Sequence, residues 1–383
     1  MLDPRELLSA AEKREEEMVA TAISLAEIES PSDDKAALDR MAQFAAGRFA
    51  NMGGRVTLHP QASAGDHLQV TFGGRAHVKP ILLLGHLDTV WPMGTLQTMP
   101  VRESGGKLYG PGVFDMKAGI AMAVYAIAML QKIHGWLPRP VTVLLVSDEE
   151  TGSASSRVIT EKLAREHAAV LVLEPSFGPK GALKTSRKGV GEYSLRVQGI
   201  SSHAGLDFEK GQSAVLELSK QIVKVSEFTD RKRGITVNPG VIAGGSRSNV
   251  IAAEAKAQID LRIATGRDAR AMDKKFRGLK PFNKKCKLTI SGGINRPPLE
   301  RSNRVKGLFG MAREIANEMG FKLEEASVGG GSDGNFTAAL GVPTLDGLGA
   351  VGDGAHATHE QVVIGALPWR TSLLASLIER IES

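Results

Sequence analysis

The sequence has little of several residue types, and each shortage excludes a class of protein or site. It contains one cysteine, Cys286, which excludes an internal disulfide and a cysteine-based zinc site. Aromatic residues make up only 5% of the chain and no nucleic-acid recognition motif accompanies the basic residues, so the net charge of +6 does not predict nucleic-acid binding. We expect no segment to be apolar enough to cross a bilayer, and the first residues lack the apolar core of a signal peptide. The expectation is a cytoplasmic protein outside the membrane.

The length and composition of the chain predict more than one domain. At 383 residues it exceeds what one hydrophobic core usually serves, and 42% of its residues are hydrophobic. In the first half, short continuous apolar runs alternate with helix-like segments, a pattern typical of parallel strands buried between helices. These runs are PILLLGHLDTV, VTVLLVSDEE and AAVLVLEP. We expect an α/β fold with a mixed, mostly parallel sheet flanked by helices.

The pattern changes over residues 188–300. Strand-like and helix-like segments follow one another there in the order β-α-β-β-α-β, the signature of a small ferredoxin-like domain. After Arg301 the chain resumes the character of its first half, with the helix-like segment KGLFGMAREIANEMG. The sequence therefore predicts a discontinuous domain made of residues 1–187 and 301–383, into which residues 188–300 are inserted.

Each of the three apolar runs ends on polar residues. His86 and Asp88 end the first run, Asp148–Glu150 end the second, and Glu174 ends the third. In open α/β sheets ligands bind outside the carboxyl ends of the strands, so these groups are expected to converge. Clustered carboxylates repel one another unless cations neutralise them, and a mixture of histidine and carboxylate suits a zinc-type ion. Taken singly, Glu149 or Glu150 would fit the first turn of a helix equally well.

Two later segments offer further ligands. The segment YGPGVFDMKAGIA places Asp115 after a Gly-Pro-Gly turn, where it would serve either as a helix N-cap or as a ligand. The segment DGAHATHEQ places His356 and His359 in a late loop, where an isolated histidine is usually solvated. The residues alone leave these alternatives open.

Taken together, these segments resemble the M20 family of metallopeptidases, and most of all its glutamate carboxypeptidase branch. The matching segments occur in the family's order and span about residues 80 to 360. They are GHLDTV, GPGVFDMKAGIA, SDEETGS, LEPS, GISSHAG, SNVI, DLRIA, GGGSDGNF and GAHATHEQ. The resemblance implies a zinc-exopeptidase-type fold and a hydrolase with two Zn²⁺ ions per subunit, in whose place Co²⁺ or Mn²⁺ could bind.

The resemblance also implies a ligand set for the two ions. Asp115 would bridge them. His86 and Glu174 would complete the ligands of one ion, and Glu150 and His356 would complete those of the other.

Two further carboxylates receive roles from the same resemblance. Asp88 would lie behind His86 and fix its tautomer. Glu149 would be the general base that takes a proton from the attacking water.

Two details of the family pattern can be placed on this chain. The family's histidine ligand stands a few residues before a glutamate, and Glu360 therefore favours His356 over His359. The family also has a cis peptide after the bridging aspartate, which here is the bond from Asp115 to Met116.

Four residues beyond the metal ligands would contact the substrate. His203 would reach the active site of the partner in a homodimer formed by the inserted domain, and would stabilise the tetrahedral oxyanion. Asn249 and Arg262 would bind the terminal carboxylate of the substrate, which a guanidinium group suits well. Gly330 would let the backbone approach the substrate closely. Without the resemblance, His203 is a turn histidine, Arg262 is a solvated side chain, and the loop with Gly330 is a flexible connector.

The implied reaction is hydrolysis of an amide bond that releases a C-terminal acidic amino acid from a small peptide or N-acyl amino acid. Deacylases of the acetylornithine deacetylase or succinyl-diaminopimelate desuccinylase type, and dipeptidases, use the same metal site and remain alternatives. Arg262 and the mild positive charge favour an acidic leaving group. A non-catalytic binding protein of this fold would lack a ligand or the base, whereas every expected residue is present.

Overall fold

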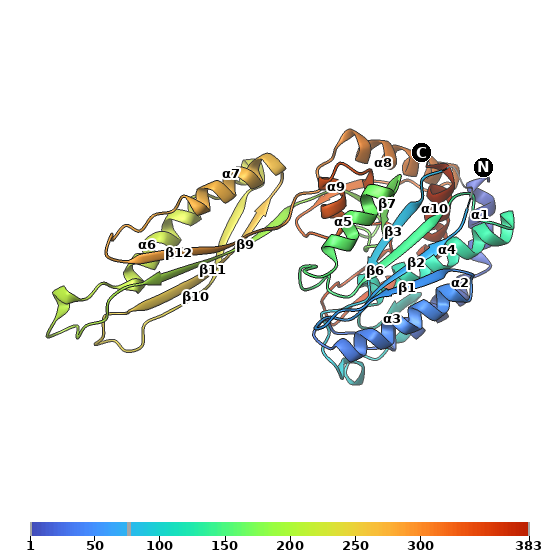
Figure 1. Cartoon of the computed structure of the whole chain (residues 1–383). Coiled ribbons are helices and arrows are strands. Elements are labelled where there is room, and N and C mark those ends of the chain that lie inside the picture. The colour runs from blue at the N-terminus through green and yellow to red at the C-terminus, as the bar shows by residue number, and fades with distance from the viewer. Residues whose placement is uncertain (1, 75–77, 382–383) are drawn as a thin grey trace. The chain divides into compact units, whose positions relative to one another are not determined.

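The computed structural model describes residues 2–74 and 78–381, and the chain forms two compact units (Figure 1). Unit 1 comprises Met1–Ser186, Arg301–Ser327 and Ser332–Ser383, and unit 2 comprises Arg187–Glu300 and Val328–Gly331. Unit 2 therefore contains the inserted segment expected from the sequence and, in addition, the short stretch Val328–Gly331. The N–H of Lys188 donates to the carbonyl of Val328 at 3.0 Å, and the guanidinium of Arg187 donates to the carbonyl of Gly331 at 3.0 Å. These bonds tie the short stretch to unit 2.

A six-stranded sheet forms the centre of unit 1. Its strands, in spatial order, are β1 (Arg55–His59), β2 (His67–Phe72), β6 (Val141–Val146), β3 (Ile81–His86), β7 (Ala169–Val172) and β14 (Thr344–Leu345). The strands from β6 to β14 are parallel, whereas β1 and β2 pair in antiparallel fashion. Every residue of β3, β6 and β7 is buried, which explains their continuous apolar runs. The expected mixed, mostly parallel sheet is confirmed.

Helices cover both faces of this sheet (Figure 1). The larger core lies under α1 (Pro4–Glu12), α2 (Glu15–Ala26), α3 (Lys35–Ala50), α4 (Ala118–His134), α8 (Asn303–Glu318) and α10 (Leu367–Arg380). The smaller core lies under α5 (Arg157–Glu166) and α9 (Gly334–Ala339). Side chains alternate between the two cores along each strand, so that Leu83 belongs to the first and Leu84 to the second.

Short strands bring distant parts of unit 1 together. The remaining strands are β4 (Arg102–Ser104), β5 (Lys107–Tyr109), β15 (Gly352–Asp353), β16 (Gln361–Val363), β8 (Leu183–Arg187) and β13 (Glu325–Val328). The first four form a sheet in the order β15-β16-β5-β4, and β8 pairs with β13. Because Gln361 pairs with Tyr109, the loop after β5 and the loop before β16 are neighbours.

Unit 2 is a four-stranded antiparallel sheet with two helices. Its elements in chain order are β9 (Gly189–Gln198), α6 (Ala214–Ser226), β10 (Thr236–Gly244), β11 (Glu254–Ile263), α7 (Gly266–Arg277) and β12 (Lys287–Arg296). The spatial order is β10-β11-β9-β12, with α6 and α7 on one face (Figure 1). Tyr193 of β9 stacks on Phe276 of α7 with 4.0 Å between ring centroids, which joins sheet and helix layer. The expected β-α-β-β-α-β order is confirmed.

The expectation that no segment is apolar enough to cross a bilayer was wrong. The segment Val113–His134, which includes α4, is long and apolar enough by length and composition. However, 83% of its most apolar window is buried within the protein, where α4 packs against α2 and α10. The central helix of a folded core has the same composition, because it is apolar on all sides.

Candidate metal centre

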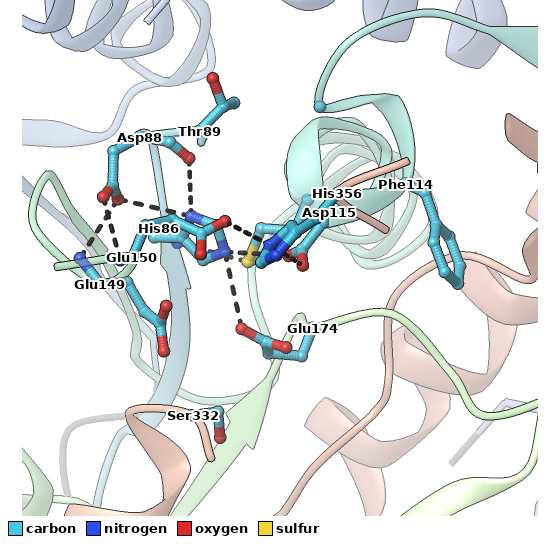
Figure 2. Close-up of polar contacts among 12 residues, drawn as sticks. His86, Asp88, Thr89, Phe114, Asp115, Glu149, Glu150, Glu174, Ser332 and His356 are labelled. Carbon is cyan, nitrogen blue, oxygen red and sulfur yellow. Dashed lines mark hydrogen bonds and ion pairs between the residues drawn. The ribbon is translucent and has the colours of Figure 1, made fainter. Parts of the chain in front are cut away.

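The carboxyl ends of three neighbouring strands carry the polar groups of the candidate site. His86 is the last residue of β3, Glu149 and Glu150 follow β6, and Glu174 follows β7. Because β6, β3 and β7 are parallel and adjacent, these ends meet at one edge of the sheet. Figure 2 shows the side chains facing one another across this edge.

Asp115 lies between two histidines. Its Oδ1 atom is 3.1 Å from Nε2 of His86, and its Oδ2 atom is 3.5 Å from Nε2 of His356. His86 Nε2 is also 3.5 Å from Oε1 of Glu174, and His356 Nε2 is 3.1 Å from Oε1 of Glu150. The five side chains therefore form two clusters that share Asp115 (Figure 2).

These distances fit a pair of divalent ions. Zinc bonds of about 2.0–2.2 Å in tetrahedral geometry place neighbouring ligand atoms about 3.3–3.6 Å apart. The nitrogen–oxygen distances of 3.1–3.5 Å are close to that separation. One atom each from His86, Asp115 and Glu150 lie within 4.8 Å of one another, and so do one atom each from His86, Glu149 and Glu174. The nitrogen and carboxylate donors are those that zinc accepts.

The acids and histidines of the two clusters shift one another's pKa values. Burial lowers the pKa of His86, but hydrogen bonds to carboxylates, that of Asp115 first, raise it well above its ordinary value. Hydrogen bonds to Asp115 and Glu150 raise the pKa of His356 to about 10. Burial raises the pKa of Asp115, but the two histidines lower it far below its usual range. A metal ion that binds here therefore displaces protons from the histidines.

Asp88 is buried behind His86 and also holds the turn that follows β6. Its carboxylate accepts the N–H groups of Glu149 at 3.2 Å and Glu150 at 3.1 Å, and the hydroxyl of Ser32 at 2.8 Å. The backbone carbonyl of Asp88 lies 2.9 Å from Nδ1 of His86, whereas its carboxylate lies 3.4 Å away. A proton on Nδ1 leaves Nε2 as the metal ligand. In the structure the carbonyl is thus the nearer acceptor, where the sequence led us to expect the carboxylate.

Asp115 sits in an irregular turn, η2 (Val113–Lys117), immediately before α4. The peptide bond from Asp115 to Met116 is cis, as the family resemblance implied. Gly112 precedes the turn with a φ of 72°, and a Cβ atom there would lie 2.6 Å from a methyl carbon of Thr89. Only glycine fits both the conformation and the space at this position.

Glu360 accepts hydrogen bonds from the backbone of the same turn. Its carboxylate, which is 1% exposed, accepts the N–H groups of Gly112 at 2.9 Å, Phe114 at 3.0 Å and Asp115 at 3.0 Å. It also accepts the indole N–H of Trp91 at 2.8 Å. A single buried side chain thus orients the backbone that presents the shared carboxylate.

Glu360→Gln is expected to weaken metal binding. The amide nitrogen of glutamine cannot accept a hydrogen bond, so part of the donor set around residue 360 loses its acceptor. Loss of a partner that orients a ligand typically costs about 10- to 100-fold in metal affinity. Calorimetric titration of Co²⁺ into metal-depleted protein measures the change, with the exposed Glu314→Gln as the matched control. Equal affinities of the two variants would contradict the role of Glu360.

Comparison with known proteins decides the family. The model of Peptidase family M20/M25/M40 matches residues 82–380, a range that includes every residue of the two clusters. The chain belongs to this family. As an M20 protein it is a hydrolytic enzyme of the metallopeptidase and amidohydrolase class, and the recognition drawn from its motifs is confirmed.

Individual M20 proteins resemble it over nearly their whole length. Carboxypeptidase G2 from Pseudomonas sp. (strain RS-16) is 30% identical over 380 residues, which covers 97% of this chain and 91% of the relative. Succinyl-diaminopimelate desuccinylase from Stenotrophomonas maltophilia (strain R551-3) is 27% identical over 339 residues, covering 82% of this chain and 87% of the relative. A dinuclear metal-binding M20 peptidase from Bacillus subtilis shares the fold, with a TM-score of 0.70, 15% identity, and 96% and 98% of the chains covered.

The four residues predicted to contact the substrate all belong to unit 2. His203 is exposed, and its Nδ1 atom accepts the N–H groups of Gly205 and Leu206, both at 3.1 Å. The neutral ring therefore carries its proton on Nε2. The carbonyl of Asn249 accepts the N–H of Ala204 at 2.9 Å, so Asn249 lies beside His203 in unit 2.

Arg262 and Gly330 have partners within unit 2. The guanidinium of Arg262 contacts the carboxylate of Asp260 through Nε at 2.9 Å and through a terminal nitrogen at 2.9 Å. The carbonyl of Gly330 accepts from Arg187 at 3.4 Å, and a Cβ atom added at Gly330 would meet nothing within 4 Å. The M20 roles assigned to these residues stay predictions.

Sequence reasoning missed two residues that support the M20 site. Glu360 served only to choose between two histidines, and Ser32 received no role, although it donates to Asp88. His356, the histidine preferred in that choice, contacts Glu150. Glu360 could have been noticed as an acid that stands two residues ahead of the apolar pair Val362 and Val363.

Proposed function

We propose that this M20 enzyme hydrolyses an amide bond and releases a C-terminal acidic amino acid, as a glutamate carboxypeptidase does. The observation that carries the proposal is the pair of histidine–carboxylate clusters joined by Asp115, with Glu149 beside them. Similarity to carboxypeptidase G2 over 97% of the chain supports the choice of an acidic leaving group.

Two Zn²⁺ ions per subunit would occupy the clusters. His86, Asp115 and Glu174 would hold one ion, and Glu150, Asp115 and His356 the other. When bound, the ions would polarise the substrate carbonyl and lower the pKa of the attacking water towards about 7. The same donors accept Co²⁺ and Mn²⁺.

Glu149 would act as the general base. It follows the buried strand β6, its N–H is fixed by Asp88 at 3.2 Å, and its carboxylate lies with those of the first cluster. As water attacks the carbonyl carbon, Glu149 would accept a proton from it and then donate that proton to the amine nitrogen as the C–N bond breaks. The turn directs Glu149 and Glu150 to different groups, because Glu149 lies beside His86 and Glu174 whereas Glu150 contacts His356.

Residues of unit 2 would bind the substrate. The Nε2–H of His203 would stabilise the oxyanion in the site of a partner subunit, because Nδ1 is already occupied as an acceptor. Asn249, Arg262 and Gly330 would contact the terminal carboxylate and backbone of the substrate. To bind the substrate, the guanidinium of Arg262 would either leave Asp260 or contact Asp260 and the substrate carboxylate together.

A homodimer through unit 2 is part of the same proposal. Apolar side chains are exposed on α6, where Leu216 is 59% and Val223 63% exposed, and on β10, where Val241 is 52% and Ile242 59% exposed. Because β10 is an edge strand, its backbone can pair with a second copy of the chain.

A cytoplasmic location also stays a prediction.

A desuccinylase or another N-acyl-amino-acid deacylase is the second candidate. It is favoured by the 27% identity with succinyl-diaminopimelate desuccinylase over 82% of this chain. The two activities use the same metal chemistry and differ in the groups on either side of the amide.

A substrate panel separates these candidates. Purified protein reloaded with zinc is incubated with N-acyl-glutamates, N-acyl-aspartates, N-acetylornithine, succinyl-diaminopimelate and dipeptides, and amino-acid release is measured. Release of glutamate or aspartate as the fastest reaction is the expected result. Faster turnover of a basic substrate would move the enzyme to the deacylases. No turnover of any compound by protein that binds two metal ions would contradict both candidate activities.

A further inference from the structure

The turn Asp148–Ser156, which carries both Glu149 and Glu150, is held by a buried carboxylate that belongs to neither cluster. Asp148 lies two residues after the end of β6 and is only 4% exposed. Its Oδ2 atom accepts the N–H of Ser155 at 2.7 Å, the hydroxyl of Ser155 at 2.7 Å and the N–H of Ser156 at 3.3 Å. These bonds close the turn on itself.

A histidine from the neighbouring strand completes this arrangement. His67 of β2 is fully buried, and its Nδ1 atom accepts the N–H of Ser147 at 3.1 Å. A backbone N–H can only donate, so the proton of the neutral ring is on Nε2. That nitrogen lies 3.0 Å from the hydroxyl oxygen of Ser155 and therefore donates to it.

The direction of every hydrogen bond in the series is then determined. His67 Nε2–H donates to Ser155 Oγ, and the hydroxyl of Ser155 in turn donates to Asp148 Oδ2. Burial lowers the pKa of His67, which favours the neutral ring that the hydrogen bond from Ser147 requires. The series runs from β2, across β6, to the turn that bears the proposed base.

We propose that His67 is a positioning residue which, through Ser155 and Asp148, fixes the turn that presents Glu149 and Glu150. No part of the proposed mechanism uses the three side chains directly. They affect the reaction only by placing the base and one proposed ligand. The kinetic test of this proposal therefore rests on the proposed function. Metal affinity gives a second readout that does not depend on the substrate, because Glu150 is a proposed ligand.

Variants that break one bond at a time test the proposal in the full-length, zinc-loaded enzyme. Ser155→Ala removes the hydroxyl and keeps the backbone N–H, Ser155→Thr keeps the hydroxyl, and His67→Leu removes both ring nitrogens. Ser24→Ala is the matched control, since the hydroxyl of Ser24 donates to the carbonyl of Ala20 in a solvent-exposed hydrogen bond within α2. The measurements are kcat and KM on the best substrate, Co²⁺ affinity by calorimetry, and the melting temperature.

Ser155→Ala is expected to lower kcat and Co²⁺ affinity by about 10-fold each with little change in KM, as loss of an orienting partner does. Ser155→Thr should restore both. The double variant His67→Leu with Ser155→Ala should be no slower than the slower single variant, because coupled residues give non-additive effects.

Three results would overturn the proposal: multiplied losses in the double variant, a changed melting temperature with unchanged kcat and Co²⁺ affinity, or failure of threonine to restore either quantity. If the wild-type enzyme turns over no compound of the panel, the proposed function is rejected but the positioning role of His67 is not. In that case lower Co²⁺ affinity of Ser155→Ala still supports the positioning role, and equal affinities of Ser155→Ala and Ser24→Ala reject it.

Discussion

Glu149→Ala is expected to lower kcat by about 10²- to 10⁴-fold, the usual contribution of general acid–base catalysis. That loss corresponds to about 3 to 5 kcal/mol of transition-state stabilisation. The reason is that alanine can neither take the proton from the attacking water nor return it to the leaving amine. Metal content and KM should stay near those of the wild type, since Glu149 is proposed as the base and not as a ligand. Steady-state kinetics and metal analysis of the same preparation measure both.

Glu103→Ala is the control for this variant, because Glu103 is an exposed glutamate on β4. Its kinetics should equal those of the wild type. If Glu149→Ala lost metal in proportion to activity, Glu149 would be a ligand, which its place beside His86 and Glu174 also permits. The role of general base would then pass to another group.

Asp115→Asn is expected to remove metal from both clusters at once. Asp115 presents one oxygen at 3.1 Å to His86 and the other at 3.5 Å to His356, and asparagine offers only one oxygen and no negative charge. The loss of metal affinity should exceed the roughly 10- to 100-fold that a partner behind a ligand contributes. Activity should fall with metal content. Metal analysis after dialysis and Co²⁺ calorimetry measure the change.

Asp88→Asn and Asp33→Asn calibrate this result. Asp88 supports the site without facing both histidines, so its variant should fall between Asp115→Asn and the wild type. Asp33 is exposed, and its variant should bind metal as the wild type does. Retention of two ions by Asp115→Asn would show that this carboxylate does not join the clusters.

The strand-end groups could be predicted because burial and polarity are both visible along the chain. In β3, β6 and β7 every residue is buried, and a parallel sheet places the ends of such strands together. That reasoning brought His86, Glu150 and Glu174 to one edge. It could not place Asp115 or His356 there, and the family resemblance supplied them.

The supporting hydrogen bonds were beyond sequence reasoning because they join loops that are far apart along the chain. Glu360 and Asp115 are separated by 245 positions, and Ser155 and His67 by 88. An apolar pattern shows which face of an element is buried but not which polar group meets which. The composition of the segment Val113–His134 likewise does not distinguish a core helix from a membrane span.

The buried carboxylates of Asp88 and Glu360 have a consequence for how the enzyme acquires its metal. In a zinc finger the ion itself organises the chain, and the apo form is unfolded. Here two buried carboxylates already hold both turns. Asp88 accepts the N–H groups of Glu149 and Glu150, and Glu360 accepts the N–H of Asp115. We therefore expect the metal ions to bind a chain that is already folded, so that metal supply and affinity, rather than the order of folding, decide which ion is bound.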